Sequence, residues 1–231
     1  MKVRSAVCAV FVFLSAAVFA GAGDVASFVN LGFSDDSAYF MFGFHGAEAD
    51  TGKPFAEIFT VDVKANRFVS GGAKKAVYPD ILKPGQGSEG AFFTLLEENG
   101  PLTRKSSINH LKQGRLLYIL VNGDESKESL EFRDFNTGSR YKFRLIQNAR
   151  GVGADAKAAF HIEFETTLKD GRTRTYAVGL PGHYRENVLA YRIKQVILSP
   201  DERHLVFIVE KDHFARGGKS VRYMAETVKL F

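Results

Sequence analysis

The chain has 231 residues, of which 45% are hydrophobic and 25% charged, and this composition excludes an intrinsically disordered protein. Its one cysteine, Cys8, lies near the N-terminus, so a disulfide framework and thiolate chemistry are excluded for the rest of the chain. The net charge of +5 is spread without a long run of Lys or Arg, which excludes an obvious nucleic-acid footprint, and we expect no nucleic-acid partner.

Residues 1–20 have the pattern of a signal peptide. Lys2 and Arg4 give a basic start, and residues 6–19 form an uncharged run that is too short to span a bilayer. Small residues end this run, which predicts cleavage after Ala20, with Ala22 as the alternative. Loss of the two basic residues lowers the net charge from +5 to +3. We therefore expect a periplasmic or secreted protein with no integral membrane segment after cleavage.

Residues 21–231 are expected to form a single, mainly antiparallel β domain. The first half begins with four predicted strands, at residues 25–33, 38–44, 55–63 and 67–70. Three or four antiparallel strands in about 45 residues match the size of one β-propeller blade. The pattern favours a propeller-like arrangement, with a β-sandwich as the alternative.

A short helical insertion is predicted around residues 88–113. Phe92, Leu95 and Leu96 fall at helical spacing behind Ser88, which is a possible N-cap. A second short helix is expected over residues 102–113. In an otherwise β sequence, such a pair of helices is typically used to cover a sheet edge or the end of a barrel.

Strands are predicted again in the second half of the chain. They lie at residues 116–121, 129–134, 140–147, 158–168, 172–178, 188–198 and 222–230. Glycine-containing segments at residues 179–187 and 211–219 are interpreted as loops.

Two segments of the chain look like copies of one strand–turn–strand unit. Laid side by side without a gap, Ser199 falls on Ser34 and Asp201 on Asp36. Ser and Asp side chains hydrogen-bond backbone groups nearby in turns, and alternating apolar residues follow in both copies. These units resemble blades of the TolB type of β-propeller.

The order of parts is similar to that of a bacterial family of predicted secreted proteins of unknown function. The resemblance rests on the signal peptide, the hairpin at residues 33–43, the helical residues 91–96, the Gly-Pro-Leu-Thr segment at 100–103, and β structure to the C-terminus. The resemblance implies export and implies no activity, cofactor or site residue.

The two predicted loops near the C-terminus are the strongest candidates for a binding site. Each combines His, Arg and an aromatic residue beside glycines, and loops on a rigid β scaffold commonly carry binding groups. If the loops emerge within about 15 Å of each other, they form one wall for an anionic ligand, because Arg suits carboxylate and phosphate and Tyr offers apolar area with a polar tip. The candidate residues are His183, Tyr184, Arg185, His213 and Arg216.

A metal site is a weaker candidate. His161 and Glu163 share one face of a predicted strand, but zinc needs a third protein ligand that the sequence does not place, and a solvated strand face is the better explanation of the pair. We therefore expect no cofactor and no assigned catalytic residue. The leading hypothesis is a non-catalytic binding module whose partner is a protein or an anionic cell-envelope polymer. The alternative is a metal-dependent or carboxylate hydrolase outside the cytoplasm.

Overall fold

The structure, a computed structural model, describes residues 24–121, 127–215 and 218–230. Within these residues it has three antiparallel sheets, and one follows the order β4 (Arg67–Val77), β3 (Pro54–Asp62), β2 (Tyr39–Ala47), β1 (Ser27–Ser34) and β5 (Ile108–Asn109). The second has the order β13 (Gly218–Lys229), β12 (His204–Ala215), β11 (Val188–Leu198) and β6 (Arg115–Ile119). The third has the order β10 (Thr173–Glu186), β9 (Lys157–Thr167), β8 (Arg140–Arg150) and β7 (Ser129–Arg133). We call them the N-terminal, middle and outer sheets. The predicted signal peptide, residues 1–20, lies outside the described residues.

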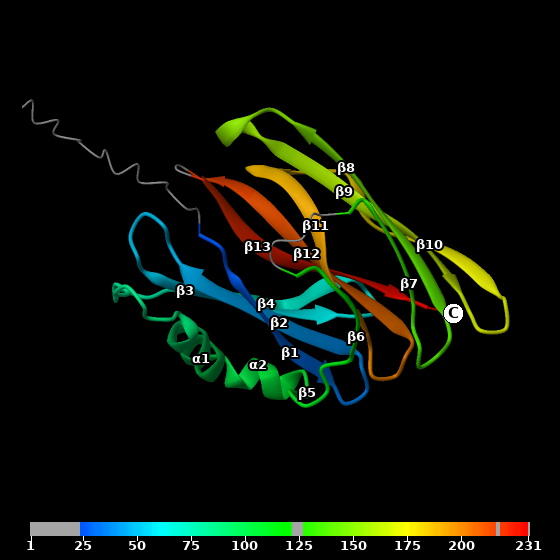
Figure 1. The fold of residues 1–231 in the computed structure, drawn as a ribbon. Coiled ribbons are helices and arrows are strands. Elements are labelled where there is room, and N and C mark those ends of the chain that lie inside the picture. The colour runs from blue at the N-terminus through cyan, green and yellow to red at the C-terminus, as the bar shows by residue number, and fades with distance from the viewer. Residues whose placement is uncertain (1–23, 122–126, 216–217, 231) are drawn as a thin grey trace, which may run out of the picture.

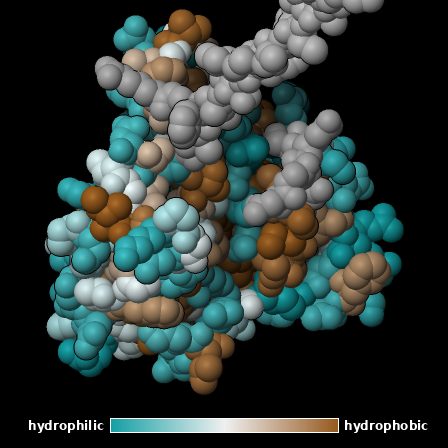
Figure 2. All heavy atoms as spheres, turned by 60° about the vertical axis from the view of Figure 1, so that its left-hand side comes forward, coloured by the Kyte–Doolittle hydropathy of each residue, from teal (hydrophilic) through white to brown (hydrophobic). Residues whose placement is uncertain are grey.

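The sheets stack face to face, with two helices on the far side of the N-terminal sheet (Figure 1). These helices are α1 (Glu89–Glu98) and α2 (Gly100–Lys105), and a 3₁₀ turn, η1 (Gly153–Asp155), joins β8 to β9. Three apolar clusters fill the spaces between the layers: helices on N-terminal sheet, N-terminal on middle, and middle on outer. On the face drawn in Figure 2 the surface is mostly hydrophilic, and apolar residues gather beside a hollow in its middle.

The middle sheet is buried on both faces, which explains the sequence of β12. Its residues 205–209 are apolar without interruption, as expected for a strand with no solvated face. Phe207 belongs to the cluster shared with the outer sheet, whereas Val206 and Ile208 belong to the cluster shared with the N-terminal sheet. All three side chains are fully buried.

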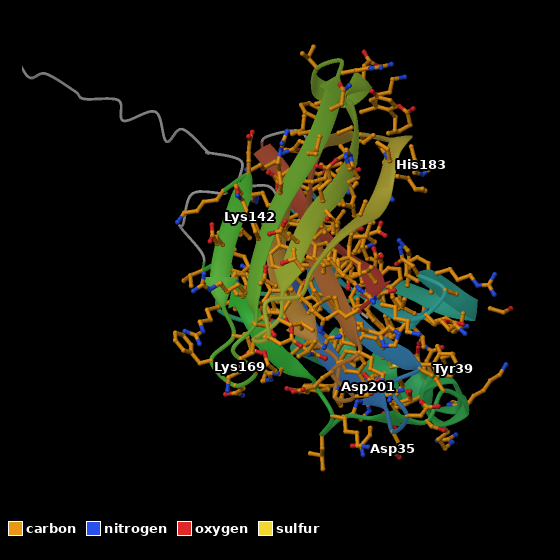
Figure 3. All side chains as sticks on the ribbon, turned by 90° about the vertical axis from the view of Figure 1, so that its right-hand side faces the viewer. Asp35, Tyr39, Lys142, Lys169, His183 and Asp201 are labelled. Atoms are coloured by element: carbon orange, nitrogen blue, oxygen red, sulfur yellow. The ribbon has the colours of Figure 1, made fainter. Side chains whose placement is uncertain are left out.

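The two predicted copies are strand–turn–strand units with matching hydrogen bonds. Ser34 Oγ donates to Asp36 Oδ1 (2.6 Å), and Ser199 Oγ donates to Asp201 Oδ1 (2.5 Å). In each turn the same serine oxygen also accepts a backbone N–H five residues later. Asp35, in the first turn, and Asp201 lie at one end of the molecule in Figure 3, whereas His183 lies towards the other. The repeat therefore marks corresponding hairpins, β1–β2 and β11–β12, in neighbouring sheets.

The propeller-like arrangement inferred from this repeat is not supported. The fold is mainly β and antiparallel, but the three sheets stay open within the described residues and no propeller closure is present there. The middle sheet also takes its strand β6 from an earlier part of the chain than β11–β13. The similarity of the two turns reflects their local hydrogen bonds. It does not determine whether the sheets stack in layers or surround a central axis as propeller blades do.

The helical insertion is shorter than predicted. The first helix agrees with the prediction, although Ser88 makes no capping hydrogen bond and its Oγ instead lies 2.8 Å from His45 Nδ1. The second helix ends at Lys105, and β5 then pairs with β1. Ser107, with a φ of 49°, turns the backbone out of the helix, and Leu111 is 94% exposed rather than packed on a helix face.

Both segments interpreted as loops near the C-terminus are instead largely strand. β12 and β13 continue as a long hairpin through most of residues 211–219. β10 extends to Glu186, but its pairing with β9 jumps from Leu180 to Arg185. Residues 181–184 therefore form a bulge, an extra stretch that pairs with nothing on β9. Residues 181–183 of the predicted loop, which are exposed to solvent, belong to this bulge.

Candidate functional site

A pocket of about 610 Å³ lies where the edge strands of the three sheets meet. β4, β13 and β10 are the edge strands of their sheets on this side. Asn66, in the β3–β4 turn, donates a hydrogen bond to Glu226 of β13 (2.6 Å), and Arg185 of β10 lies 3.9 Å from the same carboxylate. Residues of all three sheets thus line one space.

The pocket is lined mainly by cationic and aromatic side chains. Its basic residues are Lys75, Arg185, Lys211, His213 and Arg222, and among the described residues Glu57 is the one acidic side chain in the lining. The aromatic lining consists of Phe44, Phe59, Phe68, Phe214 and Tyr223. We call this space the basic pocket.

Some of these cations are paired. Lys75 Nζ lies 2.6 Å from Glu57 and 5.6 Å from the centre of the Phe59 ring. Arg222 lies 2.6 Å from the carboxylate of Asp24 and stacks over Phe55. These contacts fix the two side chains at the rim of the pocket and neutralise them in part.

Lys211 is different, because it makes no ion pair with any residue in the described part of the chain. Burial lowers its pKa to about 8, although the more distant Glu57 opposes this shift. Burial also lowers the pKa of His213 to about 4, and the positive charges of Lys211 and Arg222 add to the effect. At neutral pH the pocket therefore holds an unpaired ammonium beside a neutral imidazole.

Two buried polar atoms of the lining residues also lack partners. Arg185 Nη1 and His213 Nε2 are shielded from solvent and make no hydrogen bond to any described residue. Most buried polar atoms in folded proteins are hydrogen-bonded, so each exception needs an explanation. An anion in the pocket would supply an acceptor oxygen for the donor Arg185 Nη1 and negative charge opposite Lys211.

The acidic residues of β12 cannot supply that charge. Glu210 and Asp212 alternate with Lys211 and His213, so they lie on the opposite face of the strand. There both carboxylates are buried and lie within 4 Å of basic side chains: Arg192, Lys194 and Lys219. The two carboxylates of β12 thus lie on one face with basic partners. Lys211 lies on the other face and makes no ion pair with a described residue.

The predicted binding residues separate into three groups. Arg185 and His213 both line the basic pocket. Tyr184 instead packs against Arg150, whose Cζ lies 4.2 Å from the centre of the tyrosine ring. His183 is exposed in the β10 bulge (Figure 3). Arg216 lies outside the described residues. The segments that hold Arg185 and His213 approach each other, because Phe214 N–H donates to Asn187 O at 3.3 Å.

The sequence did not single out the other pocket residues. Lys75, Glu57 and Arg222 come from strands far apart in the chain, and each looks like an ordinary solvated strand residue. The alternation of Glu210, Lys211 and Asp212 was the one available signal, because it places the lysine on a different face from its acidic neighbours.

His161 and Glu163 lie on β9, 3.6 Å apart at their closest polar atoms. The Glu163 side chain is about half exposed, as expected for a solvated strand face. The described residues contain no group of three or more His, Cys, Asp or Glu side chains that could hold a metal ion.

A family model described as "Predicted secreted protein (DUF2259)" matches residues 41–229. The chain belongs to this family. No match was found among curated proteins or among solved structures.

The DUF2259 match agrees with the predicted resemblance to secreted proteins of unknown function, and it gives no support to blades of the TolB type. The matched range contains every basic and aromatic residue of the basic pocket. No helix in the described part of the chain is long and apolar enough to cross a membrane.

Proposed function

We propose that this member of the DUF2259 family is an exported binding module of the cell envelope that holds an anionic group of its partner in the basic pocket. The observation that carries the proposal is that Lys211, which makes no ion pair among the described residues, shares a pocket with the buried and unpartnered donor Arg185 Nη1. Export is supported by the signal-peptide pattern and by the family description.

The basic pocket is costly to maintain without a ligand. A partly buried cation loses hydration, and a buried donor without an acceptor loses a hydrogen bond that water would give it. A carboxylate or phosphate group restores both, because its oxygens accept hydrogen bonds from Arg and its charge offsets that of Lys. The aromatic lining adds apolar area for the uncharged part of the ligand.

Binding of simple anions tests this proposal. Tripolyphosphate and poly-glutamate would be titrated into the mature protein, with affinity measured by calorimetry and stabilisation by the melting temperature. We expect both probes to bind and to raise the melting temperature. The double substitution Arg185→Gln and Lys211→Gln should weaken binding by at least about tenfold, because it removes the lysine without an ion pair and the arginine with an unused buried donor.

The matched control is the double substitution Lys142→Gln and Arg144→Gln. Both residues are exposed on β8, and the change in net charge is the same as in the pocket variant. If the control weakens anion binding as much as the pocket variant does, the attraction is non-specific and the proposed function is wrong. If neither probe binds the wild-type protein, the proposal is also overturned.

A further inference from the structure

The outer edge of β13 borders the basic pocket and a second pocket beside it. The second pocket, of about 400 Å³, shares three lining residues with the first: Phe68, Arg185 and Met224. Its lining also includes Ala225 and Glu226 of β13. The two pockets follow one strand edge, and we call them together the β13 groove.

Pairing at the start of β13 shows which of its backbone groups face this groove. Val221 N–H donates to Asp24 O (2.9 Å), and Val221 O accepts from Ala26 N–H (3.3 Å). Both backbone groups of Val221 therefore point away from β12. Backbone direction alternates along a strand, so Tyr223, Ala225 and Thr227 also present their N–H and C=O groups to the outer edge.

Other parts of the chain cover the two ends of this edge. Residues 24–26 pair with Val221 at one end, as a short parallel bridge. At the other end Thr227 N–H donates to Asn66 Oδ1 (2.7 Å). Between them, the outward N–H and C=O groups of Tyr223 and Ala225 make no hydrogen bond to any residue that the structure describes.

The open edge lies between two walls. β4 supplies Phe68 and Lys75 on one side, and β10 supplies Leu180 and Arg185 on the other. Phe68 is 47% and Leu180 59% exposed, which is high for large apolar side chains within strands. Phe68 and Arg185 line both pockets, whereas Lys75 lines only the basic pocket and Leu180 only the second pocket.

We infer that the β13 groove binds an extended peptide segment of a partner protein, which adds to the middle sheet by pairing with Tyr223 and Ala225. This inference rests on the proposed function and names its ligand class. Open strand edges bind extended peptides through backbone hydrogen bonds, and pockets beside the edge select alternate side chains. An anionic polysaccharide offers no comparable row of alternating N–H and C=O groups.

The charges in the groove define the peptide further. In the basic pocket Lys75, Lys211 and Arg185 outnumber Glu57, so acidic side chains fit in the Tyr223 half of the groove. In the second pocket Arg185 lies 3.9 Å from Glu226, which leaves a smaller excess of positive charge there. The exposed rings and methyl groups of Phe68 and Leu180 suit apolar side chains in the Ala225 half. The expected ligand is a short extended segment with acidic residues next to apolar ones.

A pooled library of peptides of about eight residues, each with adjacent acidic and apolar pairs, provides the probe. The pool would be applied to immobilised mature protein, and retained members would be resynthesised with N-methyl groups at alternate backbone nitrogens. N-methylation removes the N–H donors and leaves the charge unchanged. We expect at least about a tenfold loss of affinity in one of the two alternating N-methyl series and a smaller loss in the other, because only one set of N–H groups faces β13.

The outcomes separate this inference from the proposed function. If no peptide is retained, or if both N-methylated series bind as well as the parent, the peptide inference is overturned. If tripolyphosphate or an anionic polysaccharide still binds in that case, the anion-binding function stands. Failure of every anionic probe overturns both. The substitution Ala225→Pro, which removes an outward N–H that the fold does not use, should weaken peptide binding but leave tripolyphosphate binding unchanged.

Discussion

The repeated turns and the basic pocket are both rich in polar side chains, but they treat these groups in opposite ways. In the turns, Ser199 Oγ both donates to Asp201 and accepts from the backbone N–H of His204. In the pocket, Arg185 Nη1 and His213 Nε2 are buried without partners in the described part of the chain. The Ser–Asp pairs of the turns complete their hydrogen bonds within the chain, which indicates a structural role, although the neighbouring His204 Nδ1 is buried without a hydrogen bond. Orphan atoms that line one pocket together with a lysine that has no ion pair indicate instead a surface shaped for a ligand.

The largest expected effect is on the turn side of this comparison. Asp201→Ala removes the acceptor for Ser199 Oγ and for the backbone N–H of Arg203, and should lower the free energy of unfolding by about 1–2 kcal/mol. Asp36→Ala should cost a similar amount, because Asp36 accepts the same two hydrogen bonds, from Ser34 Oγ and from the backbone N–H of Ala38. Urea denaturation of both variants checks this. A loss of stability at only one of the two turns would show that the repeat is not energetically equivalent.

A smaller effect of opposite sign is expected in the pocket. Lys211→Met removes a partly buried charge and keeps the length of an apolar stem, so it should raise the free energy of unfolding by about 1 kcal/mol. The same variant should lose affinity for tripolyphosphate. Lys142→Met, on the exposed face of β8, serves as the control and should change neither property. A destabilised Lys211→Met would mean that the lysine has a structural partner, and the contrast with the turns would fail.

At neutral pH the smallest expected effect is that of His213, whose contribution appears only as a pH dependence of stability in acid. Its pKa is about 4 in the folded protein, below the ordinary value of 6.5, because burial disfavours the charged ring. The unfolded chain therefore binds a proton between these two pH values and the folded chain does not, so this contribution is complete above pH 6.5 and is lost as the pH falls towards 4. The difference in unfolding free energy between wild type and His213→Asn isolates this contribution. A difference that is constant from pH 7 to pH 4 would contradict it.

Local chemistry was predictable from the sequence, and the assembly of the layers was not. The hairpin turns followed from Ser and Asp at fixed spacing, since these side chains bond their own neighbourhood. The stacking of the sheets depends on β6 joining β11, a pairing between residues 115–119 and 195–198 that no local pattern encodes.

The same limit applied to the candidate site. Arg185 and His213 were selected for residue type, and they share a pocket because β10 and β12 lie in adjacent layers. Tyr184 was selected with them, but alternation along β10 turns it away from its neighbour. Lys75 could not be predicted, because its place in the pocket depends on the order of strands in the N-terminal sheet. That order makes β4 an edge strand, and its Lys75 lines the pocket together with residues of β13.

The burial of the middle sheet on both faces has a consequence for how the protein is made. A chain exported from its N-terminus delivers the N-terminal sheet first, then β6, and next the outer sheet, but β11–β13 come last. Until these strands arrive, the apolar faces that they cover on both neighbouring sheets have no partner, so the packing of the middle sheet against its neighbours forms only after synthesis is nearly complete. The export route therefore has to tolerate an intermediate whose apolar surface stays exposed until the last strands arrive. A chain that ends before His204 leaves two apolar clusters incomplete, the one shared with the N-terminal sheet and the one shared with the outer sheet.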